Sequence, residues 1–382
     1  MKITGIICEY NPFHLGHQKQ IDRIRAENED CGIVCLMSGN FVQRGQPAIA
    51  DKSFRAKAAI LSGADLVLEL PVTAALSSAE GFASEGVRLL SGFCDCLCFG
   101  SETGDKDGLL TVAQALLSPA FPEALGAELK KGVSFPAARQ AALENMGINS
   151  DLLLRPNDIL AVEYCKAILS QNSRLTPMPI LRQGNYHDTA ADASDPSATA
   201  VRELMLNHAD WKRFMPQSAH CCFEGAALHT LAAGQRAVLG KLRVMSDEEF
   251  EALPYGSEGL WRKLMHASRQ ERTLEDILGA VKSKRYTHTR LTRMIMCAFL
   301  GLTEADIRSP APYARVLALN DRGRDILKLA RQSGVFPNIG EKVDHPYQAI
   351  ENRCSALYGL FSTETPDAPD AESAQRIFYH KN

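Results

Sequence analysis

The sequence has no hydrophobic run long enough to cross a membrane. No stretch of about 20 apolar residues occurs in its 382 residues, so no membrane-spanning helix is expected. The apolar run at residues 2–8 is too short for the hydrophobic part of a signal peptide. The 11 cysteines are scattered and odd in number, which favours reduced thiols in a cytoplasmic protein. Their spacing predicts no metal site.

The signature motifs of several common enzyme classes are also absent. Residues 234–242, GQRAVLGKL, space their glycines wrongly for a phosphate-binding loop and place Leu242 after Lys241. No GxGxxG follows the first predicted strand, and neither HExxH nor GxSxG occurs. These absences argue against P-loop nucleotidases, dinucleotide-binding enzymes, zinc proteases and α/β-hydrolases.

The first half of the chain alternates short apolar runs with helical patterns. Strands are predicted at 2–8, 32–37, 65–70, 94–99 and 177–182. Helices are predicted at about 16–28, 51–63, 78–92 and from 197. This alternation is typical of a parallel sheet with helices on both faces. At 382 residues the chain is too long for one ordinary core. We therefore predict an α/β, Rossmann-like domain at 1–205 and a mostly α-helical domain at 206–382.

The segment NPFHLGH (11–17) directly follows the first predicted strand. Ligands of parallel α/β sheets bind at the carboxyl ends of the strands, and a helix N-terminus favours an anion there. Two imidazoles, His14 and His17, would add hydrogen-bond donors for phosphate oxygens. The segment SATAVR (197–202) begins a second helix and offers a hydroxyl cluster with Arg202. The alternatives for the two histidines are surface polarity, a helix cap, or part of a metal site.

Two further segments carry polar or basic side chains. The run SGNFVQRG (38–45) follows the second predicted strand, and Arg44 is a candidate for binding phosphate or carboxylate. The run KSKRYTHTRLTR (282–293) contains five basic residues and no acidic one. With a net charge of −3 over the whole chain, any contact with nucleic acid must come from such a local patch. A solvated helix face is the alternative for this run.

The motifs together resemble one enzyme family. HLGH resembles the HxGH motif of the nucleotidyltransferase superfamily, and SATAVR resembles its second motif. The wider set resembles the tRNA(Met) cytidine acetate ligases from residue 1 to about 360: EYNPFHLGH, MSGNFVQRGQPAIADK, GADLVLELPV, FGSE, RPNDILAVEY, SATAVRE and SKRYTHTRLTR. Leu15 stands where the family usually has Asn, and Ala198 where the wider superfamily often has Ser or Thr. Neither departure removes a candidate ligand.

The resemblance implies a two-step reaction. ATP, expected with Mg²⁺, would activate acetate as acetyl-adenylate. The wobble cytidine of elongator tRNA(Met) would then receive the acetyl group as N4-acetylcytidine. The resemblance gives His14 and His17 catalytic roles. The implied ATP-binding residues are Ile7, Cys8, Glu9, Tyr10, Asn11, Pro12, Phe13, His14, Leu15, Gly16, His17, Gln18, Lys19, Gln20, Gly100, Asn157, Arg182, Ser197, Thr199 and Arg202.

Further roles follow from combining the resemblance with the local patterns. Asn157 is also expected to cap a helix, and Gly100 and Arg182 to follow strands. The expected RNA-binding residues are Lys282, Lys284, Arg285, Tyr286, Arg290 and Arg293, with Tyr286 stacking on a base. The expected partners are ATP, acetate and elongator tRNA(Met), with no stable protein partner.

Two rival functions remain open at this stage. The first is an adenylyl- or cytidylyltransferase that acts on a small molecule through the same HxGH chemistry and has no RNA substrate. The basic run at 282–293 argues against it. The second is a non-catalytic nucleotide-sensing or RNA-binding module. The complete set of His14, His17, Ser197, Thr199 and Arg202 argues against that one.

Overall fold

The computed structural model describes residues 1–182, 197–283, 286–332, 337–338, 345–364 and 375–381. Lys284 and Arg285, two of the expected RNA-binding residues, lie outside this part of the chain. Among the described helices, none is both long and apolar enough to cross a membrane.

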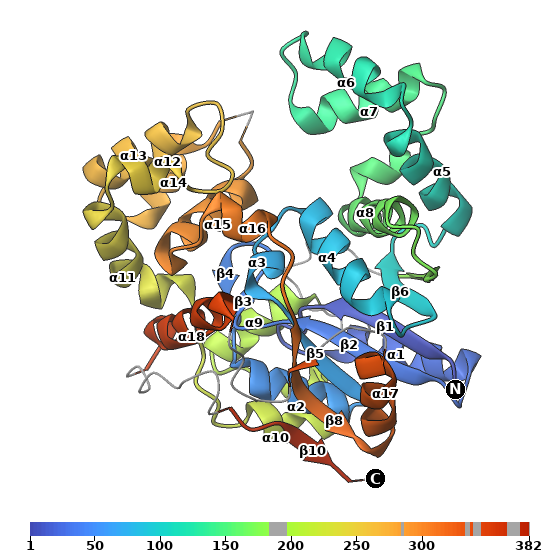
Figure 1. Ribbon diagram of the computed structural model, residues 1–382. Helices are drawn as coiled ribbons and strands as arrows, with labels where there is room; N and C mark the ends of the chain where they lie inside the picture. The colour runs from blue at the N-terminus through green and yellow to red at the C-terminus, as the bar shows by residue number, and fades with distance from the viewer. Residues whose placement is uncertain (183–196, 284–285, 333–336, 339–344, 365–374, 382) are drawn as a thin grey trace.

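An eight-stranded, mostly parallel sheet forms the centre of the molecule (Figure 1). Its order is β10-β8-β5-β2-β1-β6-β7, with β9 paired to β8. The first five strands in the chain to enter it are β1 (Ile3–Cys8), β2 (Gly32–Ser38), β5 (Leu66–Leu70), β6 (Cys96–Ser101) and β7 (Thr176–Leu181). These confirm the five predicted strands to within two residues at each end. A separate antiparallel hairpin, β3 (Phe41–Val42) and β4 (Gln46–Pro47), follows β2.

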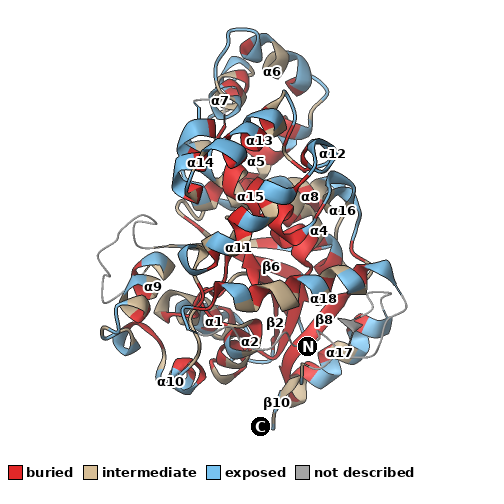
Figure 2. Ribbon diagram, turned by 90° about the vertical axis from the view of Figure 1, so that its left-hand side faces the viewer, coloured by how far each residue is buried: buried red, intermediate tan, exposed pale blue. Residues whose placement is uncertain are grey.

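Helices cover both faces of the sheet, as the alternating pattern predicted. The helices up to residue 223 are α1 (Leu15–Glu27), α2 (Lys52–Leu61), α3 (Val72–Ala75), α4 (Ala79–Ser91), α5 (Lys106–Leu117), α6 (Phe121–Leu129), α7 (Phe135–Asn145), α8 (Pro156–Ser170), α9 (Ala198–Leu206) and α10 (Gln217–Phe223). Helices α4 and α8 share one hydrophobic core with the sheet. Helices α1, α2, α9 and α10 share the core on its other face. Figure 2 shows the strands buried between these layers.

Side-chain caps fix where three of the predicted helices begin. Asp51 accepts a hydrogen bond from the Ser53 N–H at the start of α2. Ser78 accepts from Gly81 N at α4, and Ser197 caps α9 in the same way. Each cap satisfies a backbone donor that a helix N-terminus otherwise leaves without a partner. These local signals made the helix starts predictable from sequence.

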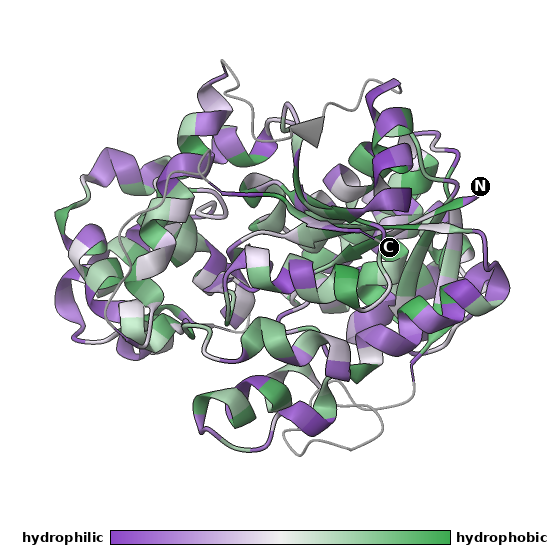
Figure 3. Cartoon of the chain, turned by 90° about the horizontal axis from the view of Figure 1, so that it is seen from below, coloured by the Kyte–Doolittle hydropathy of each residue, from purple (hydrophilic) through white to green (hydrophobic). Residues whose placement is uncertain are grey.

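A second group of helices follows residue 223 and has its own hydrophobic core. The described helices after residue 223 are α11 (Leu231–Val244), α12 (Asp247–Glu251), α13 (Leu260–Gln270), α14 (Leu274–Val281), α15 (His288–Leu300), α16 (Glu304–Arg308), α17 (Asp321–Gln332) and α18 (Pro346–Tyr358). Helices α11 to α15 and α18 contribute buried residues to this core, whereas α17 packs in the core of the sheet. In Figure 3 hydrophobic segments gather in the central strands, and the helices alternate hydrophilic and hydrophobic residues along their length. The predicted helical character of this region is confirmed.

The chain nevertheless returns to the sheet, which the sequence analysis did not predict. The additional strands are β8 (Ala314–Asn320), β9 (Pro337–Asn338) and β10 (Phe378–His380). Strand β8 pairs antiparallel with β5, and α17 packs on the same face as α4 and α8. The run ARVLALN is one isolated apolar segment between helices, and periodicity alone cannot distinguish it from a buried helix. The segment 206–382 therefore contributes to the first core as well as forming its own.

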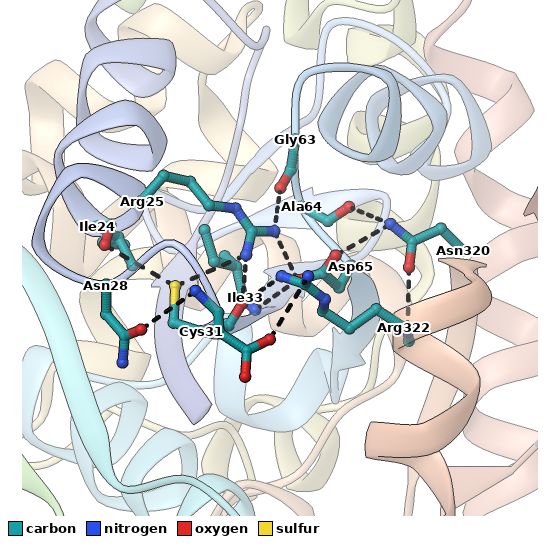
Figure 4. Close-up of polar contacts among 12 residues, drawn as sticks. Ile24, Arg25, Asn28, Cys31, Ile33, Gly63, Ala64, Asp65, Asn320 and Arg322 are labelled. Atoms are coloured by element: carbon teal, nitrogen blue, oxygen red, sulfur yellow. Dashed lines mark hydrogen bonds and ion pairs between the residues drawn. The ribbon is translucent and has the colours of Figure 1, made fainter. Parts of the chain in front are cut away.

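Polar contacts at the amino edge of the sheet hold β8 in place (Figure 4). One Asp65 carboxylate oxygen accepts from Arg25 Nη2 at 2.7 Å and from the Ile33 N–H at 2.8 Å. The other oxygen accepts from Asn320 Nδ2 at 3.0 Å. The Asn320 carbonyl oxygen of the side chain accepts in turn from Gly323 N at 2.9 Å. The end of β8 and the start of α17 are thus tied to β2 and β5, and the opposite, carboxyl edge is left for the site.

Candidate functional site

The two histidines form the N-terminal cap of α1. The chain leaves β1 through Tyr10, whose φ is 44°, and a cis Asn11–Pro12 peptide. His14 is the N-cap residue, and its Nδ1 accepts from the Gly16 N–H at 3.1 Å. His17 Nδ1 accepts from the His14 N–H at 3.2 Å. The two rings stack with their centroids 3.8 Å apart. The helix-cap alternative is therefore correct, but the cap uses only Nδ1 of each ring and leaves Nε2 for another contact.

Both imidazoles are held neutral, with the remaining proton on Nε2. Burial, and then the charges of Arg182 and Arg202, lowers the pKa of His14 to about 3. Burial, then His14 and Arg182, lowers the pKa of His17 well below its usual value. Because each Nδ1 accepts from a backbone N–H, a neutral ring must carry its proton on Nε2. The site therefore presents two Nε2–H donors without any loss of cap hydrogen bonds.

These histidines line a cavity of about 340 Å³ at the carboxyl edge of the sheet. Its walls come from the ends of β1, β6 and β7, the N-terminal turns of α1, α8 and α9, the hairpin β3–β4 and helix α4. The predicted ATP-binding residues that line it are Ile7, Cys8, Glu9, Tyr10, Asn11, His14, Gly16, His17, Lys19, Gln20, Gly100, Asn157, Arg182, Ser197, Thr199 and Arg202. Their convergence places the two sequence motifs in one site.

Four of the predicted ATP-binding residues do not line the cavity: Pro12, Phe13, Leu15 and Gln18. Phe13 is fully buried in the core beneath the turn. The Gln18 side chain is bound elsewhere, since its Nε2 donates to the Asp22 carboxylate at 2.7 Å and to the Ser62 carbonyl oxygen at 3.1 Å. Because side chains of a helix point in different directions, a continuous run such as 7–20 cannot present every member to one ligand.

The second motif lies directly against the histidine turn. Arg202 Nη1 donates to the Asn11 carbonyl oxygen at 2.7 Å, and its Nη2 donates to Thr199 Oγ1 at 3.0 Å. Ser197 caps α9, so its backbone neighbours begin another helix N-terminus at the cavity. Two helix N-termini, an arginine and hydroxyl groups therefore face one volume, which is a suitable environment for a polyphosphate.

A third group joins the ends of β6 and β7 to α8. Gly100 lies against the Arg182 side chain, and a Cβ at Gly100 would stand 2.7 Å from Arg182 Cδ. Arg182 Nη1 donates to Asn157 Oδ1 at 3.5 Å. The expected N-cap role of Asn157 is wrong, because α8 begins at Pro156 with Arg155 as its N-cap residue. Asn157 is instead free of a capping role and can direct its side chain towards Arg182.

Glu102 accepts hydrogen bonds at the start of α8. It belongs to the motif FGSE, but no role was predicted for it. Its Oε1 accepts from Asn157 N at 3.1 Å and from Asn157 Nδ2 at 2.7 Å. Its Oε2 accepts from Asp158 N at 2.8 Å. Asp158 Oδ1 accepts in return from the Glu102 N–H at 3.0 Å. This reciprocal pair fixes Asn157, and through it Arg182, beside the cavity.

The β3–β4 hairpin forms the wall nearest β1 and β2. Its cavity-lining residues are Val42, Gln43, Arg44 and Gln46. The Gln43 N–H donates to Glu9 Oε1 at 2.8 Å. Arg55 is completely buried beneath and donates to the carbonyl oxygens of Glu9 at 2.7 Å and Ser38 at 3.1 Å, and also to those of Gly39 and Ala50. One guanidinium thus holds the ends of β1 and β2 and the hairpin together.

Helix α15 supports the same hairpin from outside. Thr292 Oγ1 donates to the Arg44 carbonyl oxygen at 2.6 Å. Gly45 has φ of 73°, and a Cβ there would stand 2.4 Å from the backbone nitrogen of Arg293 in α15. The helical group after residue 223 is therefore in direct contact with one wall of the cavity.

The basic run at 282–293 differs from the prediction in its aromatic residue. Tyr286 is only 4% exposed and belongs to the core of the helical group, so the expected stacking on a base is contradicted. Arg290 Nη2 donates to the Tyr255 carbonyl oxygen at 2.7 Å, and Arg293 lies 5.3 Å from the Tyr255 ring centre. Lys282 is exposed. In the described part of the run no residue lines the cavity. The sequence does not tell whether an aromatic residue within a basic run faces solvent or the protein core.

An apolar part of the cavity was also missed. Phe82 of α4, Phe99 of β6 and Tyr164 of α8 line it, and all three belong to the core on the α4 and α8 face. The rings of Phe99 and Tyr164 have their centroids 5.3 Å apart. Tyr164 is the last residue of the quoted motif RPNDILAVEY, but nothing in that pattern tells a buried core tyrosine from one that faces a ligand.

Comparison with known proteins identifies the family. A family model described as HIGH Nucleotidyl Transferase matches residues 1–371. A tRNA(Met) cytidine acetate ligase of Clostridium tetani is 38% identical over 97% of this chain and 98% of its own length. The chain belongs to the tRNA(Met) cytidine acetate ligase family. The enzyme of that name from Clostridium novyi is 37% identical over 88% of this chain and 89% of its own.

Solved structures of the family have the same fold. The apo crystal structure of TmcAL from Thermotoga maritima superposes with a TM-score of 0.90 at 31% sequence identity, over the full length of both chains. A second crystal structure of that protein, described as bound with alpha-thio ATP, gives a TM-score of 0.88. The predicted fold class is therefore confirmed at the level of a whole-chain superposition with a tRNA(Met) cytidine acetate ligase family member.

Proposed function

We propose that this protein activates acetate with ATP and transfers the acetyl group to the wobble cytidine of elongator tRNA(Met), forming N4-acetylcytidine. The full-length relatives carry the name of that activity, and one neighbouring structure is described with an ATP analogue. The observation that carries the proposal is the stacked pair of imidazoles. Each Nδ1 accepts a backbone N–H, and both rings line a cavity that Arg182 and Arg202 also line.

In the first step, an acetate oxygen attacks the α-phosphorus of ATP and pyrophosphate leaves. Negative charge increases on the phosphoryl oxygens in the transition state, and donors already placed there lower its energy without reorganisation. His14 and His17 would donate to these oxygens through Nε2–H. Arg202, Ser197 and Thr199 would hold the β- and γ-phosphates that become pyrophosphate.

In the second step, the exocyclic N4 amine of cytidine attacks the acetyl carbonyl carbon of acetyl-adenylate. The N4–C bond forms, the bond from that carbon to the AMP oxygen breaks with its electron pair remaining on AMP, and N4 loses a proton. The chain need only keep both reacting groups in contact and exclude water, which would otherwise hydrolyse the adenylate.

Magnesium stays a proposal of this mechanism. Within the described residues, no group of three or more His, Cys, Asp or Glu side chains is placed to hold a metal ion. Glu9 is the one carboxylate in the described lining of the cavity. A Mg²⁺ ion there would be held mainly by the ATP phosphate oxygens, as is usual for nucleotide-bound magnesium, and would neutralise charge on the leaving pyrophosphate.

The proposed tRNA contacts must be revised in the light of the buried Tyr286. The five basic residues Lys282, Lys284, Arg285, Arg290 and Arg293 remain proposed phosphate contacts, because cations contact the RNA backbone without needing an exposed ring. Base recognition is then a property of the cavity and its hairpin wall, including Arg44, rather than of the basic run. The small-molecule transferase stays the alternative, because its chemistry would use the same histidines.

A labelled-acetate transfer assay tests the proposal. Purified protein is incubated with ATP and [14C]acetate, with and without elongator tRNA(Met), alongside a His17→Ala control. We expect label in tRNA that requires ATP and is lost in the control. Pyrophosphate release that never requires tRNA, together with label in a small acceptor, would replace the proposal with the alternative. A His17→Ala protein with unchanged transfer would remove the site from the reaction.

A further inference from the structure

The apolar part of the cavity lies across the sheet edge from the groups proposed to bind pyrophosphate. Those groups begin α1 and α9, which pack on one face of the sheet. Phe82, Phe99 and Tyr164 belong to the core on the other face, yet they line the same cavity. The cavity therefore connects a polar side and an aromatic side around the end of β1.

The geometry of phosphoryl transfer indicates from which side of the cavity the nucleophile approaches. The entering oxygen and the leaving pyrophosphate lie roughly in line on opposite sides of the α-phosphorus. If pyrophosphate leaves towards α9 and the histidines bind the α-phosphate, the nucleophile enters from the side of Phe82, Phe99 and Tyr164. Acetate combines a methyl group, which favours an apolar wall, with a carboxylate, which needs a hydrogen-bond donor.

Tyr164 supplies such a donor within an otherwise apolar wall. The residue is only 2% exposed and lines the cavity. Its hydroxyl forms no hydrogen bond with any residue in the described ranges of the chain, although buried tyrosine hydroxyls usually have a partner. Burial, followed by the proximity of Cys8 and Glu9, raises the pKa of Tyr164 well above its usual value, so the phenol remains a donor.

We propose that Tyr164, Phe82 and Phe99 form the acetate pocket of this enzyme. The Tyr164 hydroxyl donates to one carboxylate oxygen, and the methyl group packs on the phenylalanine rings. The other oxygen attacks the α-phosphorus, forming the O–P bond as the bond to pyrophosphate breaks. Tyr164 keeps its proton throughout and contacts the substrate directly. The inference rests on the proposed function, since it assigns the pocket to that reaction's carboxylate.

The first test is Tyr164→Phe, which removes one oxygen and keeps the packing of the ring. We expect the KM for acetate to rise at least tenfold, with the KM values for ATP and tRNA changed less than twofold. The matched control is Tyr347→Phe, another buried tyrosine, which is outside the cavity lining and should leave all three constants unchanged. Equal rises for ATP and acetate would indicate that this wall binds the nucleotide, and would overturn the inference.

The second test uses pocket size. Phe82→Leu shortens one wall while keeping it apolar, so the ratio of kcat/KM for propionate to that for acetate should rise at least tenfold. An unchanged ratio would contradict a methyl group packed on Phe82. Both tests need a wild-type protein that transfers acetate to tRNA. If wild type shows no such transfer the proposed function fails, whereas active wild type with unaltered variants overturns only the pocket.

Discussion

The cap and donor roles of His14 can be separated by two substitutions. Asn at position 14 places an acceptor where His14 Nδ1 now accepts from Gly16 N, but it has no atom at the position of Nε2. Gln reaches the Nε2 position with an amide N–H but has no acceptor at the position of Nδ1. His14→Asn therefore keeps the helix cap and removes the phosphate donor, and His14→Gln does the opposite.

The expected magnitudes differ clearly between the two variants. Removing one donor to a developing oxyanion costs about 10²–10³ in kcat. Losing a helix N-cap costs about 1 kcal/mol of stability, whereas Asn is among the best N-cap residues. We thus expect His14→Asn to unfold like wild type with kcat lower by about 10²–10³. His14→Gln should lose about 1 kcal/mol of unfolding free energy and less than tenfold in kcat.

Urea unfolding and initial rates of acetate transfer measure the two effects on the same preparations. The neutral state of the His14 ring makes the comparison sharp, because a neutral amide is a fair substitute for a neutral imidazole. If both variants lose activity equally, a protonated imidazole is required and the assignment of an Nε2–H on a neutral ring is wrong. Full activity in His14→Asn would remove His14 from the transition state altogether.

Three further predictions follow from the site. A lowered histidine pKa means that the unfolded state binds a proton that the folded state rejects, so stability falls as pH decreases from about 6.5 towards 3. Urea unfolding at pH 7 and at pH 5 measures this loss of stability, which should be about 2 kcal/mol smaller in His14→Asn than in wild type. An equal loss in the two proteins would contradict the lowered pKa of His14. Gly45→Ala should cost more stability and activity than Gly132→Ala, because both positions have positive φ but only Gly45 meets the backbone of α15; equal effects in urea unfolding and transfer assays would contradict this. Glu102→Gln should lower the unfolding free energy by about 1–3 kcal/mol and raise the KM for ATP, because an amide nitrogen would face a helix N–H. An unchanged KM for ATP would show that Glu102 does not support the ATP site.

Much of the fold was visible in the sequence because its signals are local. Short apolar runs marked the five strands, and Asp51, Ser78 and Ser197 marked helix starts through side-chain caps that need no distant partner. Strand β8 was missed because its place depends on a distant partner. It is held by pairing with β5 and by the contact from Asn320 to Asp65, which are 255 residues apart in the chain.

The site divides in the same way. The histidine turn and Arg202 were predictable as neighbours, because both α1 and α9 begin at the carboxyl edge of a parallel sheet. Glu102 was not, since its acceptor role appears only when β6 and α8 meet. Tyr286 and Tyr164 show the limit for aromatic residues. One lies in a basic run and is buried in a core, while the other lies in a helix and faces the cavity.

The central claim is that this cavity activates a carboxylate by its attack on the α-phosphorus of ATP. The most direct test supplies [18O2]acetate with ATP and elongator tRNA(Met), followed by mass spectrometry of the released AMP. The acetate oxygen that attacks phosphorus stays with AMP when the amine takes the acetyl group. We predict one 18O atom in AMP and none in pyrophosphate. Unlabelled AMP, or 18O in inorganic phosphate, would contradict the account.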